Sequence, residues 1–193
     1  MSSSPWLNIL LLPILVASLF TNPMSDNEIQ EKINYVCRQM EEFGFCNQTF
    51  NENLKSTTTD YVGLTQITIE QAITNSTNTH AFVQQLLESA TSEPLRNALI
   101  ECKNAYSTVV QSFHEAMKYF EQKEYSSMVK SEMVAPRAQS DCSSRFSISP
   151  YRKNPLADRN REMRIIIAMA IVTGHQLDVY TNQNMISFYL SFS

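Results

Sequence analysis

A long run of apolar residues at helical spacing is the feature that most restricts the fold of this chain. The run reads Leu95, Leu99, Cys102, Tyr106, Val109, Phe113, Ala116 and Phe120, so an apolar side chain recurs every three or four residues. This spacing predicts one face of an α-helix of about seven turns. Ser92 can cap its start, and Pro94 suits its first turn. Because one helix cannot bury such a face alone, the run predicts a bundle.

Three further stretches supply the partners for this helix. The first spans residues 61–90 after a cap at Asp60, and we expect it to continue through "TNSTNT" (74–79) although these residues are poor helix formers. The second spans residues 125–146, with a kink near Pro136. The third starts at Pro155 after a cap at Asn154 and runs to residue 177. Together they predict an all-α protein, an up-and-down four-helix bundle over residues 60–177.

Both ends of this bundle carry additional segments. Residues 25–54 predict an α-helical hairpin, because Ile29, Ile33 and Val36 share one helical face and "EFGF" then makes a turn. Hairpin and bundle together form one predicted domain, residues 25–177. Residues 178–193 alternate apolar side chains without a bundle pattern. We leave them unassigned, as either a flexible tail or a small added strand.

The N-terminal residues 1–22 resemble a secretory signal peptide. Residues 9–20, "ILLLPILVASLF", are mostly apolar, and this run is too short to cross a bilayer, which takes about 20 residues. The alternative is an N-terminal membrane anchor. Cleavage predicts a secreted protein with no further membrane contact. Sequons at Asn47 and Asn75 are candidates for N-glycosylation in the same compartment.

Composition and motifs exclude several functional classes. The net charge of −4 and the scattered Lys and Arg residues argue against binding of nucleic acid. The only glycines are Gly44, Gly63 and Gly174, which cannot build a phosphate-binding loop. No C-x-x-C or G-x-S-x-G motif is present, and the histidines lack metal-ligand spacing. We therefore predict no metal, no cofactor and no catalysis. A triad assembled from distant residues leaves no such motif and remains the alternative.

The cysteines are Cys37, Cys46, Cys102 and Cys142, an even number in a predicted secreted chain. Cys102 lies about 21 residues before the predicted turn near 122–124, and Cys142 about 19 after it. In an antiparallel pair of helices, residues at similar distances from the connecting turn lie side by side. Cys102 and Cys142 are therefore expected to face each other, which suits a disulfide. Cys37 and Cys46 then pair locally. Loop entropy predicts stabilisation of about 4 kcal/mol for the long loop and about 2.7 kcal/mol for the short one.

Six segments in order resemble plant invertase inhibitors and pectin methylesterase inhibitors, over residues 33–177. They are "CRQMEEFGFC", "DYVGL", "LIECKNAYSTVVQSFHEAM", "KEYSSM", "AQSDCSSRF" and "NPLADRNREM". The resemblance implies a secreted four-helix bundle with a helical hairpin, and disulfides joining the first cysteine to the second and the third to the fourth. It also implies inhibition of plant cell-wall or vacuolar carbohydrate-active enzymes, with no cofactor.

The resemblance favours pectin methylesterase as the target. Invertase-type members carry Pro-Lys-Phe where this chain has Tyr125-Ser126-Ser127. Pectin methylesterase inhibitors often carry Thr-Cys-Glu-Asp at the fourth cysteine, and their Thr and Asp contact the enzyme. This chain has Asp141 and Ser144 in those places, so neither of those contact residues is present here. The alternatives are an inhibitor of acid invertase and a non-inhibitory secreted binding protein.

The hypothesis for mechanism is occlusion of the enzyme's substrate cleft by the middle helices of a monomeric inhibitor, in a 1:1 complex. We expect this in the extracellular space of the plant cell wall, with the vacuole as an alternative. Candidate contacts are polar residues that lie off the apolar faces, namely Gln111, His114, Glu115, Lys118, Lys130, Asp141 and Ser144.

Overall fold

The structure is a computed structural model, and it describes residues 26–55, 60–147 and 154–190, with side chains in the last helix as far as Gln183. The predicted signal peptide, residues 1–22, lies outside the described residues. Every regular element in the described ranges is a helix. In order they are α1 (Asp26–Cys37), α2 (Phe43–Asn53), α3 (Tyr61–Ser89), α4 (Glu93–Glu121), α5 (Tyr125–Glu132), α6 (Ala135–Arg145) and α7 (Ala157–Leu190).

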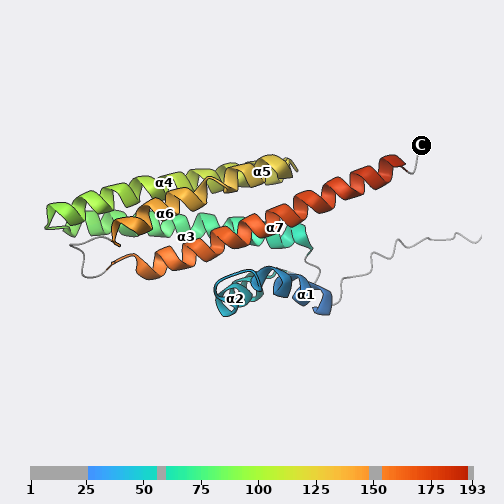
Figure 1. Cartoon of the computed structure of the whole chain (residues 1–193), viewed down its shortest axis with the longest axis horizontal. Helices are drawn as coiled ribbons and strands as arrows, with labels where there is room; N and C mark the ends of the chain where they lie inside the picture. The colour runs from blue at the N-terminus through green and yellow to red at the C-terminus, as the bar shows by residue number, and fades with distance from the viewer. Residues whose placement is uncertain (1–25, 56–59, 148–153, 191–193) are drawn as a thin grey trace, which may run out of the picture.

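The four-helix bundle is formed by α3, α4, the successive pair α5 and α6, and α7 (Figure 1). α3 packs against α4 and α7, while α5 and α6 lie between α4 and α7 on the opposite side. The core contains the predicted apolar face of α4, including Leu99, Tyr106, Val109 and Phe113, all fully buried. The prediction of an all-α bundle is therefore confirmed.

α3 continues without interruption through residues 74–79, as we predicted. Asp60 caps its start, because its Oδ1 accepts hydrogen bonds from the backbone N–H of Val62 at 2.9 Å and of Gly63 at 3.1 Å. Within the polar stretch, Ser76 is buried and its hydroxyl donates to the carbonyl of Ile73 at 3.1 Å. Satisfying this hydroxyl within the helix lets a residue of poor propensity stay helical.

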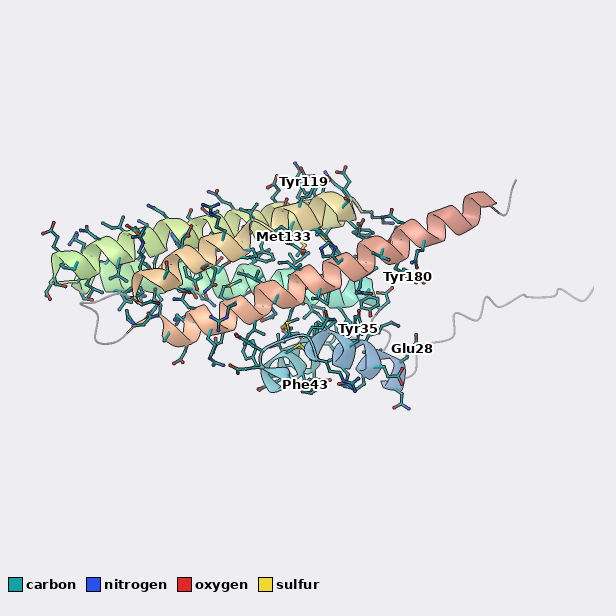
Figure 2. All side chains as sticks on the ribbon, in the orientation of Figure 1. Glu28, Tyr35, Phe43, Tyr119, Met133 and Tyr180 are labelled. Carbon is teal, nitrogen blue, oxygen red and sulfur yellow. A yellow bond between two sulfur atoms is a disulfide. The ribbon has the colours of Figure 1, made fainter. Side chains whose placement is uncertain are left out.

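The third bundle helix is broken rather than kinked. α5 ends at Glu132 and α6 begins at Ala135, so Met133 and Val134 form a joint between them. Pro136 lies in the first turn of α6, where its missing N–H removes no helical hydrogen bond. The prediction that the helix is irregular near Pro136 is confirmed, although the irregularity is a break at Met133 and Val134, just before this proline. Met133 and Val134 are 54% and 48% exposed, and Met133 is labelled in Figure 2.

α7 is longer than the sequence analysis expected. It begins at Ala157, two residues after the predicted start at Pro155, and continues to Leu190. In the turn before it, Asn154 Oδ1 accepts a hydrogen bond from the N–H of Leu156 at 2.8 Å. Residues 178–190, which the sequence analysis left unassigned, continue α7 and form no strand. No glycine or proline follows Gly174 to end the helix, and Thr181 Oγ1 donates to the carbonyl of Leu177 at 2.9 Å. Figure 1 shows the end of α7 extending past the neighbouring helices.

The hairpin α1–α2 packs on the outside of the bundle and has its own apolar cluster. Ile33 and Phe50 of the hairpin meet Leu64 of α3 and Ile165 and Met169 of α7. α7 therefore buries two faces, one toward the bundle core and one toward the hairpin, because the hairpin covers the side that would otherwise face water.

Both disulfides are present as predicted. Cys37 and Cys46 join α1 to α2, with Cα atoms 5.5 Å apart. Cys102 and Cys142 join α4 to α6, with Cα atoms 4.4 Å apart. Among the described residues, no helix is both long and apolar enough to cross a membrane.

Candidate functional site

A shallow groove of about 400 Å³ runs between α4 and α6, and we call it the α4–α6 groove. Small side chains, Ala105 of α4 and Ala138 of α6, lie in its lining, with Val134 of the joint. The remaining lining is polar or charged: Glu101, Asn104, Thr108, Arg137, Asp141 and Arg145. The groove therefore combines apolar surface with a charged rim, the composition of many protein-binding surfaces.

The charged rim follows from helical spacing. Arg137, Asp141 and Arg145 are four residues apart on α6 and so share one face. Arg145 forms an ion pair with Glu101 across the groove. Both side chains of this pair are about half exposed, at 51% and 44%. Such a pair contributes about 1 kcal/mol or less to stability, so these charges can serve recognition at little cost to the fold.

A buried polar network lies beneath α6 and holds it in place. Tyr106 of α4 donates a hydrogen bond from its hydroxyl to Asn160 Oδ1 of α7 at 2.8 Å. Gln139 of α6 donates from Nε2 to the backbone carbonyl of Asn160 at 2.9 Å. Burial raises the pKa of Tyr106, so its hydroxyl remains a donor. With the Cys102–Cys142 bridge, these contacts tie α4, α6 and α7 together at one level.

This network explains part of the family resemblance. Tyr106 belongs to the quoted segment around Cys102, and Asn160 belongs to "NPLADRNREM". Both are almost fully buried, Tyr106 at 0% and Asn160 at 3% exposure. These motif residues therefore maintain the fold, and they are not available for contact with a partner.

The predicted contact residues are all exposed, but they do not form one cluster. Asp141 lines the α4–α6 groove. Ser144 lies one turn later on α6, with its hydroxyl donating to the carbonyl of Asp141 at 3.0 Å. The others do not line this groove; they are Gln111, His114, Glu115 and Lys118 in the second half of α4, and Lys130 on α5.

Several lining residues were missed in the sequence analysis, notably Glu101, Val134, Arg137 and Arg145. The signal for the two arginines was available, because each is four residues from Asp141 on the same helix. Glu101 and Val134 gave no local signal. Glu101 reaches the groove from another helix, and Val134 is exposed only because the third bundle helix breaks beside it.

Two further hollows flank the bundle. One of about 280 Å³ lies between α6 and α7 and includes Gln139, Ser140 and Ser143. α6 is thus a ridge with a hollow on each side. The other, about 350 Å³, lies where α1, the start of α3 and α7 meet, and includes Lys32, Tyr61 and Leu177. No group of three His, Cys, Asp or Glu side chains within the described ranges is arranged to hold a metal ion.

The two sequon asparagines lie on helices. Asn47 is half-buried on α2, where its backbone carbonyl and Oδ1 both accept from Asn51 Nδ2, at 2.8 and 3.0 Å. Asn75 is half-buried on α3, with Nδ2 donating to the carbonyl of Gln71 at 3.2 Å. Glycosylation of either residue remains a prediction.

The fold first defines a class, a disulfide-bonded four-helix bundle with a helical hairpin at its N-terminal side. The chain belongs to the plant invertase/pectin methylesterase inhibitor family, whose family model matches residues 31–172. Proteins of this family inhibit enzymes and are not themselves catalysts.

Individual relatives agree with this assignment. The chain is 24% identical to a candidate invertase inhibitor from Platanus acerifolia, over 67% of this chain and 72% of the relative. It is also 24% identical to a pectinesterase inhibitor from Actinidia deliciosa, over 66% and 68%. A crystal structure of a mutant form of an Arabidopsis pectin methylesterase inhibitor shares the fold, with a TM-score of 0.67 and 14% identity. That match covers 75% of this chain and 95% of the Arabidopsis chain.

Proposed function

We propose that this protein is a secreted inhibitor of pectin methylesterase, which binds 1:1 as a monomer and covers the enzyme's substrate cleft with α6. The observation that carries the proposal is the position of Asp141 and Ser144. Both are exposed on α6, and Asp141 lies on the rim of the α4–α6 groove. These are the places at which the family resemblance puts contacts with pectin methylesterase.

The shape and chemistry of this surface support the proposal. α6 is a convex ridge between two hollows, and a ridge is the shape that can enter a cleft. Met133 and Val134 add exposed apolar surface at one end of the ridge. Desolvated apolar anchors surrounded by polar rims carry most of the affinity in protein interfaces. We expect Met133 and Val134 to act as such anchors.

The proposed location is the extracellular space of the cell wall, with the vacuole as the alternative. Two disulfides join the described helices, and disulfides persist in oxidising compartments. The signal-like residues 1–22 and the sequons at Asn47 and Asn75 agree with secretion. Detection of the protein in apoplastic wash fluid, with a mass reduced by the leader, tests this location.

Acid invertase is the second candidate target. Similarity to the Platanus acerifolia protein is as high as to the Actinidia deliciosa pectinesterase inhibitor. The segment Tyr125-Ser126-Ser127 at the start of α5 weighs against it, because it lacks the Pro-Lys-Phe of invertase-type members. The two targets are distinguished directly by assay.

The deciding experiment measures methanol release from pectin by several purified plant pectin methylesterases, with and without the folded protein. Sucrose hydrolysis by acid invertases is measured in parallel. Inhibition of at least one methylesterase, at a stoichiometry near 1:1, is the expected result. Inhibition of invertases alone would assign the second target. No effect on either enzyme class would contradict the inhibitor proposal.

Reversing the charge of Asp141 tests the surface. Asp141→Lys is expected to weaken inhibition by about tenfold or more, because charge-complementary contacts are lost and like charges are placed opposite each other. The side chain is exposed, so the midpoint of urea unfolding is expected to change little. The inhibition constant of each variant is measured with the same methylesterase.

Glu31→Lys is the matched control for this substitution. It also reverses an exposed carboxylate, but on α1 and away from the α4–α6 groove. It is expected to inhibit as well as the unsubstituted protein. Equal inhibition constants for the Asp141 and Glu31 variants would show that the α4–α6 groove is not part of the interface with the enzyme. Lys118→Glu then tests whether the second half of α4 contacts the enzyme instead.

A further inference from the structure

Glu132 is a carboxyl group buried where the third bundle helix breaks. It is the last residue of α5, directly before the joint formed by Met133 and Val134. Its side chain is fully buried, at 0% exposure. Neither carboxyl oxygen has a hydrogen-bond partner in the part of the chain that the structure describes. A buried polar group without a partner is costly to the fold, so its presence calls for a reason.

Gly174 of α7 makes the space for this carboxyl. A Cβ atom added at Gly174 would lie 2.7 Å from Glu132 Oε2, 3.0 Å from Met128 Cε and 3.2 Å from Val129 Cγ2. α5 and α7 therefore meet closely here, and a side chain at position 174 would have to push the carboxyl aside. The two other atoms nearest to that position belong to the apolar side chains of Met128 and Val129, which do not stabilise a negative charge.

No charged group on the neighbouring helices compensates the carboxyl. The surrounding helices carry these titratable residues nearby in sequence or on facing turns: Tyr125 and Lys130 on α5, Arg137 on α6, His114, Glu115, Lys118 and Glu121 on α4, and His175 and Asp178 on α7. On α3, which lies across the bundle, they are Tyr61, Glu70 and His80. All of these retain exposed surface, and none forms an ion pair or hydrogen bond with either Glu132 oxygen. Burial alone raises the pKa of Glu132 well above its usual range.

We propose that Glu132 is a proton-operated lock on the α5–α6 joint. With its carboxyl neutral, the end of α5 packs against α7 beside Gly174 and holds the joint in place. When the proton is lost as the pH rises, the charged side chain is driven toward water and the joint opens, moving Met133 and Val134. The inference concerns the fold alone and holds whichever enzyme the protein binds.

The sign of the effect follows from linkage. The folded chain keeps a proton on Glu132 that the unfolded chain releases near the ordinary pKa of glutamate, about 4.3. The stabilisation is complete below that value and is lost as the pH rises toward the pKa of the folded state. Across this window, Glu132 raises the unfolding equilibrium constant by up to about tenfold per pH unit. The contribution of Glu132 to the free energy of unfolding is therefore largest at acidic pH.

Urea unfolding of the full disulfide-bonded protein between pH 4.5 and 8 tests the proposal, with Glu132→Gln as the comparison. Glutamine has nearly the same shape and stays neutral at every pH. The unfolding constant of the unsubstituted protein, divided by that of Glu132→Gln, is expected to rise by about tenfold per pH unit over part of this range. The glutamine variant thus becomes more stable relative to the unsubstituted protein as the pH rises. A constant ratio would overturn the lock.

Two further measurements keep the test decisive. Glu115→Gln is the matched control, since it neutralises an exposed glutamate on the facing helix α4, and its ratio is expected to stay nearly flat. Hydrogen exchange of the amides around Met133 and Val134 is expected to accelerate with pH, beyond its intrinsic pH dependence, in the unsubstituted protein only. If Glu132→Gln does not fold, Glu132→Leu replaces it. If the infrared difference spectrum between the unsubstituted protein and Glu132→Gln shows no carboxylic acid band at pH 5, Glu132 is ionised and the lock is refuted.

Discussion

Replacing Cys102 and Cys142 together with alanine is expected to lower the free energy of unfolding by about 4 kcal/mol. The bridge joins residues 40 apart in sequence, so its loss frees a long loop in the unfolded chain. In the folded chain both cysteines are fully buried between α4 and α6, and alanine fits both positions. The double variant is expected to fold. The loss is nevertheless a large fraction of its total stability, because single domains are stable by only about 5–15 kcal/mol.

Chemical denaturation of the two forms measures this loss, and the other disulfide provides the internal comparison. Removing Cys37 and Cys46, which are only 9 residues apart, is expected to lower the free energy of unfolding by about 2.7 kcal/mol. The order of the two effects matters more than their absolute size. A larger loss from the short loop would show that the hairpin bridge acts through the native state, on the apolar cluster that joins it to α7.

The Cys102–Cys142 variant also has a local consequence. Cys142 follows Asp141 directly and lies two residues before Ser144, so the bridge sets the position of the proposed contact surface. Inhibition by the variant is expected to weaken beyond what the unfolded fraction explains. Hydrogen exchange along α6 identifies the loosened segment. Unchanged inhibition per folded molecule would show that the buried network alone positions α6.

The four bundle helices could be predicted because their information is local. The apolar residues of α4 recur at helical spacing, and the cap at Asp60 and the turn at Asn154 are marked by residue type. The pairing of Cys102 with Cys142 followed from counting along two antiparallel helices. In each case the deciding pattern lies within one helix, or in the short turn between two.

The features that were missed depend on contacts between distant segments. Ile165 and Met169 lie on a second face of α7 that is buried only because the hairpin packs there. Glutamate is a residue type that usually lies at the surface, yet Glu132 is fully buried opposite Gly174. The α4–α6 groove joins residues from two helices and a break between helices. None of these follows from spacing along one element.

Substituting Asn160 with alanine is expected to lower the free energy of unfolding by about 2–3 kcal/mol. The Asn160 side chain accepts the hydrogen bond from the Tyr106 hydroxyl at 2.8 Å, and both side chains are buried. Alanine removes that acceptor and leaves a small cavity. The hydrogen bond from Gln139 reaches the backbone carbonyl of Asn160 and survives the substitution.

A double-mutant cycle with Tyr106→Phe isolates the hydrogen bond. Phenylalanine keeps the ring and removes only the hydroxyl, so the single change is expected to lower the free energy of unfolding by about 1–2 kcal/mol. If the two side chains act through their mutual bond, the double variant loses less than the sum of the single losses. Asn104→Ala, an exposed asparagine on α4, is the control and is expected to change stability by less than about 0.5 kcal/mol.

Because Tyr106 and Asn160 are buried beneath α6, the Tyr106 and Asn160 variants are expected to inhibit normally once corrected for the folded fraction. That outcome separates residues that hold the surface from residues that touch the enzyme. Strictly additive losses in the cycle would contradict a Tyr106–Asn160 coupling. The shared family motifs around Cys102 and Asn160 would then need another physical explanation than this hydrogen bond.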